Sequence, residues 1–87
     1  MKSLKQNSPT NHVRQLAKTF SYKQIANCIN EQIETQSNSC TIYGENTQVL
    51  NILSRAGVVR RLVDEGTSLS DAMRELGRRI RNLLTNN

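Results

Sequence analysis

The chain has 87 residues, of which only two tyrosines and one phenylalanine are aromatic, so we expect one small domain with an aliphatic core. No apolar run approaches the ~18 residues of a membrane span, and the polar start lacks the apolar stretch of a secretory signal, so a cytoplasmic protein is expected. The net charge of +5 comes from the two ends of the chain, since the middle is mildly acidic. This asymmetry suggests a polyanion or an acidic protein as partner, and the alternative is a solvated surface that keeps the protein soluble.

The first apolar pattern begins after Pro9. Residues 1–8 are polar and basic, and we expect them to be a disordered tail in front of a single helical domain over 9–87. Proline suits the first turn of a helix, where its missing N–H goes unused. The apolar positions that follow have the spacing i, i+3, i+4, i+7 and predict a short helix over 9–19: Val13, Leu16, Ala17 and Phe20.

A second helix is predicted after Ser21. Ser21 and Gln24 have the spacing of a capping box, in which the hydroxyl accepts from one backbone N–H and the amide side chain reaches back to the other. Phe20 and Ile25 flank this cap at the positions of a hydrophobic staple. We expect the helix to cover 22–34 and to bury a face made of Ile25, Ala26, Ile29 and Ile33.

A long polar loop over 35–46 is expected to separate the second helix from the third. Asn46 or Thr47 has the chemistry of an N-cap for a helix over 47–65. The apolar positions of this segment keep their helical phase through Gly57. One helix, weakened by about 1 kcal/mol at that glycine, is therefore favoured over a break into two.

The last helix is predicted over 69–84. Gly66 is a natural stop for the preceding helix, and Ser68 with Asp71 marks a new helix start. An apolar stripe with steps of four and three then runs to the end of the chain: Leu69, Met73, Leu76, Ile80 and Leu83. Together the segments predict an all-α fold, a compact bundle of three or four helices.

Little in the sequence could carry catalysis. His12, the single histidine, has no neighbouring acid or cysteine that would make it a general base or a metal ligand. Cys28 and Cys40 form neither a C-x-x-C motif nor a disulfide framework, so we expect two reduced thiols rather than a redox pair or a disulfide. The four glycines are scattered and build no phosphate-binding loop. The sequence therefore predicts a protein that is not an enzyme and uses no metal or cofactor.

Residues 13–55 contain a pattern found in DNA-binding proteins. The string "SYKQIANCIN", residues 21–30, is followed after the polar loop by "TQVLNIL", residues 47–53. This order resembles the helix-turn-helix units of site-specific serine recombinases and of small bacterial regulators. The resemblance implies a DNA-binding or regulatory protein whose third helix reads the bases. The loop before that helix is longer than the turn of three or four residues that such units use.

The outward face of the third helix would then carry recognition. Gln48, Asn51 and Arg55 have the spacing i, i+3, i+7, and their side chains can pair with adenine or guanine edges. Other basic residues are candidates for contacts with phosphates or with an acidic partner: Lys18, Lys23, Arg60, Arg61, Arg74, Arg78 and Arg81. Nearby acids oppose a phosphate surface: Glu31, Glu34 and Glu45. The alternative for this face is a solvated polar surface without a ligand.

A second class of function starts from the C-terminal half. The apolar stripes of residues 54–84 predict a helical hairpin. This segment resembles small uncharacterised bacterial proteins, and the resemblance implies no particular activity. These stripes could bury against a second chain, and the face that carries Arg74, Arg78 and Arg81 could dock an acidic protein. The alternative function is therefore a helical adaptor for protein–protein interaction, with a homodimer as one form.

Overall fold

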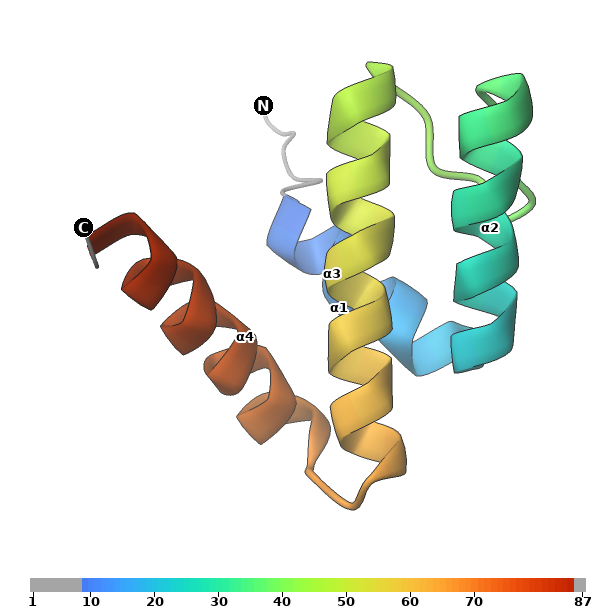
Figure 1. Cartoon of the computed structure of the whole chain (residues 1–87). Helices are drawn as coiled ribbons and strands as arrows, with labels where there is room; N and C mark the ends of the chain where they lie inside the picture. Colours follow the sequence, from blue (N-terminus) through green and yellow to red (C-terminus); the bar gives the residue numbers. More distant parts are fainter. Residues whose placement is uncertain (1–8, 86–87) are drawn as a thin grey trace, which may run out of the picture.

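The computed structural model describes residues 9–85, and over this range the chain forms four helices and no strand. They are α1 (Pro9–Thr19), α2 (Tyr22–Thr35), α3 (Asn46–Asp64) and α4 (Leu69–Thr85) (Figure 1). The all-α prediction is confirmed, and no predicted boundary is more than one residue away from the observed one. The tail expected over 1–8 lies outside the described residues. In the described range, no helix has the length and apolar character needed to cross a membrane.

The central element of the fold is α3. The other three helices all pack against it, whereas α1 and α2 make little contact with each other. The helix continues through Gly57, as predicted, and α2 approaches it there with Tyr22 and Ile25. The side chains that α3 contributes to the core are fully buried: Val49, Leu53, Ala56 and Val59. The core is therefore organised around one helix rather than around the α1–α2 junction.

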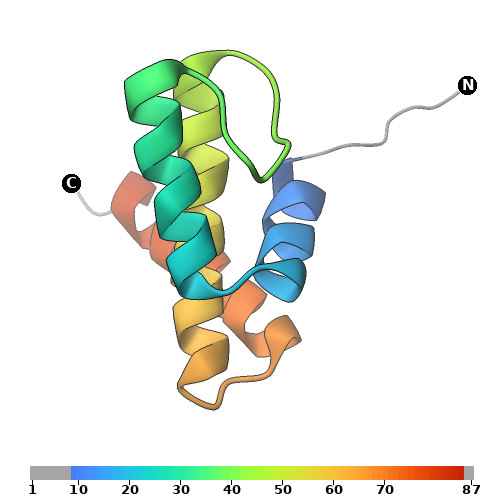
Figure 2. The ribbon, with the colours of Figure 1, turned by 90° about the vertical axis from the view of Figure 1, so that its right-hand side faces the viewer.

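Side by side, α2 and α3 form an antiparallel hairpin (Figures 1 and 2). The predicted capping box begins α2: the Gln24 N–H donates to Ser21 Oγ at 3.1 Å, and the Ser21 N–H donates to Gln24 Oε1 at 2.8 Å. The predicted cap of α3 is wrong, because Glu45 caps this helix by accepting from the Gln48 N–H at 3.0 Å. Asn46 is not free for that role, since its side chain accepts from Gln32.

The two cysteines form a disulfide, which corrects the expectation of reduced thiols. The segment 36–45 doubles back along α2 and brings Cys40 next to Cys28, with 6.1 Å between the Cα atoms. Both side chains are buried in the hydrophobic core. The spacing of twelve residues in the sequence carries no such signal, because the return of the loop depends on tertiary packing. The bridge attaches the loop to the hairpin.

The buried face of α2 differs from the predicted one. Of the predicted face, Ile25 is buried and Ala26 and Ile29 are half-buried, but Ile33 is 62% exposed. Cys28 and Gln32, which that prediction left out, are buried, and 2% of the surface of Gln32 is exposed. Gln32 tolerates burial because both ends of its amide have partners. Its Nε2 donates to Asn46 Oδ1, and its Oε1 accepts from Asn38 Nδ2, each at 2.8 Å. The disulfide and this amide network turn α2 so that Ile33 faces outward.

A tight turn connects α3 to α4. The Gly66 N–H donates to the Val63 carbonyl and the Thr67 N–H to the Leu62 carbonyl, both at 3.0 Å, which is a Schellman motif with Gly66 at φ +109°. Ser68 Oγ then accepts from the Asp71 N–H at 3.1 Å and begins α4, as predicted.

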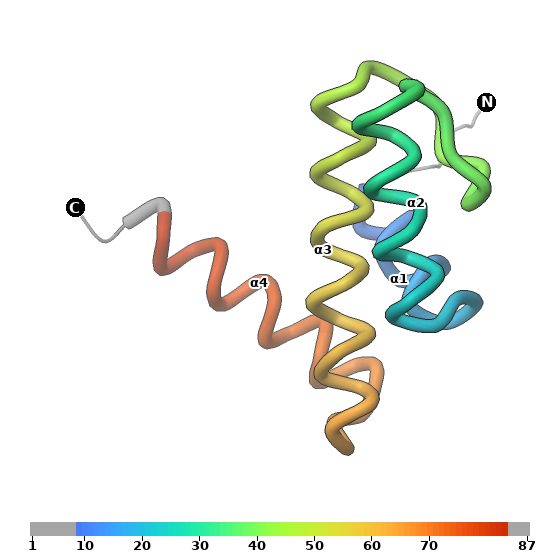
Figure 3. Tube along the Cα trace, turned by 45° about the vertical axis from the view of Figure 1, so that its right-hand side comes forward, coloured from blue at the N-terminus to red at the C-terminus, as the bar shows by residue number. Residues whose placement is uncertain are grey.

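From this turn, α4 packs its first part on α3 and then diverges from it, so that the far ends of the two helices lie apart (Figures 1 and 3). Burial follows the same course. Ala72 and Leu76 belong to the core, Ile80 is half-buried, and Leu83 is 78% exposed. The apolar stripe of α4 is therefore covered at its start and open at its end.

Candidate binding groove

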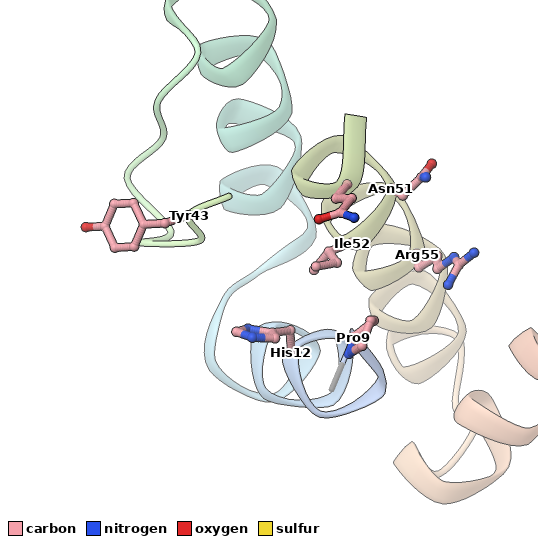
Figure 4. A pocket seen from close by; sticks show the side chains of 7 residues that line it. Pro9, His12, Tyr43, Asn51, Ile52 and Arg55 are labelled. Atoms are coloured by element: carbon pink, nitrogen blue, oxygen red, sulfur yellow. The ribbon is translucent and has the colours of Figure 1, made fainter. Parts of the chain in front are cut away.

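A cavity of about 370 Å³ lies beside the N-terminal half of α3 (Figure 4). Three parts of the chain build its wall. Pro9 and His12 come from α1 and Tyr43 from the segment 36–45, and α3 supplies the rest: Gln48, Asn51, Ile52 and Arg55. The α3 residues share one side of the helix because they follow helical spacing. The cavity thus combines amide, guanidinium, imidazole and phenol groups with an apolar side chain.

The three candidate base-reading residues do come together in this wall. Gln48 and Asn51 are exposed, and Arg55 is half-buried. Among residues 9–85, no carboxylate lines the cavity. Of the acids that the sequence places near it, Glu45 accepts from the Gln48 N–H as the cap of α3, and Glu31 accepts from the Ser39 N–H at 2.8 Å. The wall is therefore rich in hydrogen-bond donors and carries one permanent positive charge.

A second cavity, of about 210 Å³, lies where α4 diverges from α3. Its lining is mostly apolar and comes from three helices: Thr10, Val13, Arg55, Met73, Leu76, Gly77 and Ile80. Arg55 belongs to both cavities. We call the two cavities together the Arg55 groove. It has a polar half beside the N-terminal half of α3 and an apolar half against α4.

Arg55 differs from its neighbour Arg60 in its partners. Arg60 donates from Nε to Asp64 at 2.9 Å and from Nη1 to the Ala17 carbonyl at 3.0 Å, so it ties α3 to α1. The Arg55 guanidinium has no hydrogen bond and no ion pair within residues 9–85. A half-buried cation without a partner has lost part of its hydration without compensation. An anion placed in the groove would supply that compensation.

The remaining candidate contacts do not share one surface with Arg55. The Arg61 guanidinium lies over the Tyr22 ring, 5.7 Å from its centroid, which places it on the α2 side of α3. Lys18 and Lys23 are exposed on α1 and at the start of α2. Arg74 pairs with Asp71 at 3.0 Å. The structure therefore distributes these cations around the molecule.

Arg78 is also engaged within its own helix. It donates to both oxygens of Glu75, at 3.0 and 2.6 Å, and Arg79 donates to the same carboxylate at 2.9 Å. These hydrogen bonds, first that of Arg78 and then that of Arg79, lower the pKa of Glu75 from 4.5 to about 2. The same contact raises the pKa of Arg78. The one carboxylate of Glu75 offsets one of the two positive charges of Arg78 and Arg79.

Arg81 lies differently, beside the groove. Its Nη1 is 3.4 Å from the position that a Cβ would take on Gly77, which lines the apolar half. Of the α4 arginines that the sequence singled out, it is the one whose guanidinium approaches the groove.

Sequence reasoning missed most of the groove. The sequence assigns no site role to Pro9, His12, Tyr43 or Gly77. These residues come from α1, from the segment 36–45 and from α4, so no local motif could group them. The signal present in the sequence was the outward triad on α3. No protein-family model, curated protein or solved structure matches this chain. The function therefore has to be argued from the chemistry of the groove.

Proposed function

We propose that this protein is a non-enzymatic binding module that holds an acidic segment of a partner protein in the Arg55 groove. One observation carries the proposal: a half-buried guanidinium without a partner in residues 9–85 stands between two cavities whose walls contain no carboxylate. Arginine binds carboxylates through two parallel N–H donors, which gives both energy and orientation. It is also enriched among the residues that dominate protein interfaces.

Neighbouring side chains support the same chemistry. Gln48 and Asn51 can donate to a carboxylate or to a backbone carbonyl of the bound segment. Ile52 below them and Met73 and Ile80 along α4 offer apolar contact. Protein-binding surfaces usually combine polar groups, which orient the partner, with apolar area.

DNA binding is the second candidate, and the outward triad favours it. Gln48 and Asn51 stand exposed on one face with Arg55 a turn further on, which suits contacts to base edges. It ranks lower because the helices of a helix-turn-helix cross steeply, whereas α2 and α3 lie side by side (Figures 1 and 2). The candidate phosphate contacts are also dispersed or paired. The likeness of residues 13–55 to helix-turn-helix units stays a prediction.

A cytoplasmic location stays a proposal, which the disulfide between Cys28 and Cys40 opposes and which the state of these cysteines in cells tests. Disulfides persist in oxidising compartments and are rare in the cytosol. Trapping the protein from cells with an alkylating reagent, followed by mass spectrometry, measures the state of Cys28 and Cys40. Alkylated thiols agree with a cytoplasmic protein. A fully oxidised pair contradicts that location.

The binding proposal is tested with two labelled anions of similar charge, an oligoglutamate peptide and a short DNA duplex. Fluorescence anisotropy at low salt should show that the peptide binds at micromolar concentrations of the protein. Arg55→Ala should weaken this binding about tenfold or more, the size of a lost charge-assisted contact. Arg74→Ala, which removes the same charge from the exposed face of α4, should leave it nearly unchanged. Binding of the duplex without binding of the peptide would contradict this proposal and favour DNA binding as the function.

A further inference from the structure

The diverging ends of α3 and α4 leave an open angle in which one more helix can pack. The two helices touch near the turn over 65–68 and separate towards their far ends (Figures 1 and 3). The apolar stripe of α4 continues into the open part with Ile80, which is half-buried, and Leu83, which is 78% exposed. Stripes with a spacing of three residues are what an amphipathic helix packs against.

The apolar half of the Arg55 groove lies inside this angle. Val13, Met73 and Leu76 form its floor and walls. Gly77 widens it, because a Cβ at that position would meet only Nη1 of Arg81, at 3.4 Å, and otherwise open space. A cavity of about 210 Å³ has room for the side chain of a leucine or a methionine.

Two arginines lie beside the angle. Arg55 borders the groove from α3, and Arg81 reaches over Gly77 from α4. The acids of the same part of α4, Asp71 and Glu75, project from the opposite side of the helix, because they are two residues away from Met73 in either direction. They are bound there to the arginines of that side. A ligand that enters the angle therefore meets cations and apolar side chains together.

We infer that the occupant is an amphipathic helix of a partner protein, with an apolar side chain in the cavity between α3 and α4 and a carboxylate on Arg55. The inference rests on the proposed function and specifies its ligand. The carboxylate compensates the guanidinium, and the apolar face of the incoming helix covers Ile80 and Leu83. This is the helix-in-groove mode of recognition, in which one helix face supplies the anchors.

Three peptides of equal length test this assignment. The first combines leucine and glutamate so that the leucines form one helical face. The second has the same composition in an order that scatters the leucines, and the third has lysine in place of glutamate. Isothermal titration should show the first binding at least about tenfold more tightly than the other two, the factor expected from burial of one apolar side chain.

Two variants localise the binding. Gly77→Leu fills the apolar cavity and should abolish the preference for the first peptide. The same change improves helix propensity, so the melting temperature should not fall, which separates a blocked groove from a damaged fold. Asn82→Leu adds an identical side chain to the exposed opposite face of α4 and should leave the titration unchanged.

The outcomes separate the two proposals. Equal binding of the first two peptides would overturn the helix assignment and leave the binding of an acidic segment intact. Binding of neither peptide, together with retention of duplex DNA, would overturn both. Sedimentation measures the oligomeric state in parallel. A dimer that Gly77→Leu dissociates would show that a second copy of the chain occupies the angle between α3 and α4, which also contradicts the assignment.

Discussion

The α2–α3 hairpin and α4 are both built from amphipathic helices, but they are held in different ways. The hairpin is held at several points. The disulfide joins α2 to the segment 36–45, the capping box fixes the start of α2, and the buried amide of Gln32 bonds to that segment and to α3. In contrast, α4 is attached at its start, through the turn over 65–68. Three of its arginines, Arg74, Arg78 and Arg79, pair with carboxylates of the same helix.

This difference separates the part of the molecule that maintains the fold from the part that is available to a ligand. The buried amide of Gln32 in the hairpin already has partners, and most apolar side chains of the hairpin are buried or half-buried, with Ile33 as an exception. Along the Arg55 groove, one cation and the end of one apolar stripe are left uncovered. The next changes test this separation, from the largest effect on stability to the smallest.

Truncation in the centre of α3 should have the largest effect. Leu53 is fully buried, and Leu53→Ala should lower the free energy of unfolding by about 2–5 kcal/mol, because a cavity is left in a small core. Urea denaturation measures it. Leu83→Ala, at the exposed end of α4, should change stability by no more than about 0.5 kcal/mol. Similar losses for the two variants would contradict the open end of α4.

Reduction of the disulfide should come next. Opening the bridge between Cys28 and Cys40 should lower the free energy of unfolding by about 2–4 kcal/mol, since the unfolded chain regains freedom. Hydrogen exchange should then accelerate in the segment 36–45 and in the second half of α2. The amides of α4 should keep their rates, and an equal acceleration there would show that the two regions unfold as one.

Loss of the buried amide should have a smaller effect. Gln32→Ala removes the partner of the Asn46 side chain and one of the partners of Asn38, which still bonds to the backbone of Ile42, and should cost about 1–3 kcal/mol. Thermal denaturation by circular dichroism gives the change. Glu34→Ala, an exposed position on the same helix, is the matched control and should have little effect. A Gln32 variant as stable as this control would show that the network adds nothing.

Protonation of Glu75 should have the smallest effect, because its ion pairs lie within α4. The folded pKa of Glu75 lies near 2, below its ordinary 4.5, so the contribution of its pairs is complete above that ordinary value and is lost as the pH falls towards 2. Solvent exposure keeps this contribution small. A carboxyl titration followed by NMR should place the midpoint near 2. Replacing Arg78 and Arg79 by alanine should return it towards 4.5, and an unchanged midpoint would exclude these pairs as its cause.

Local patterns predicted the helices well because their signals are local. The capping box at Ser21, the stop at Gly66 and the start at Ser68 each depend on residues within one turn of the helix end. The stripe through Gly57 kept its phase, and the helix is continuous there. These features require no knowledge of what packs against them.

The predictions that failed concern features that depend on how the segment 36–45 packs back against α2. A buried glutamine and a disulfide turn α2, and neither follows from apolar spacing, which favoured Ile33 as a core residue. The groove was predicted only along its α3 side. Periodicity placed Gln48, Asn51 and Arg55 on one face, but the opposing walls at His12 and Ile80 come from helices whose placement only the tertiary structure defines.

The disulfide also determines what a protease would leave behind. A cut at residues 36–39 falls between the two bridged cysteines, so the pieces would stay covalently joined and migrate as one band on a gel without reductant. A cut after Tyr43, whose side chain is 83% exposed, lies beyond Cys40 and would release the fragment that carries α3 and α4. Two nicks a few residues apart in one loop would thus give different products.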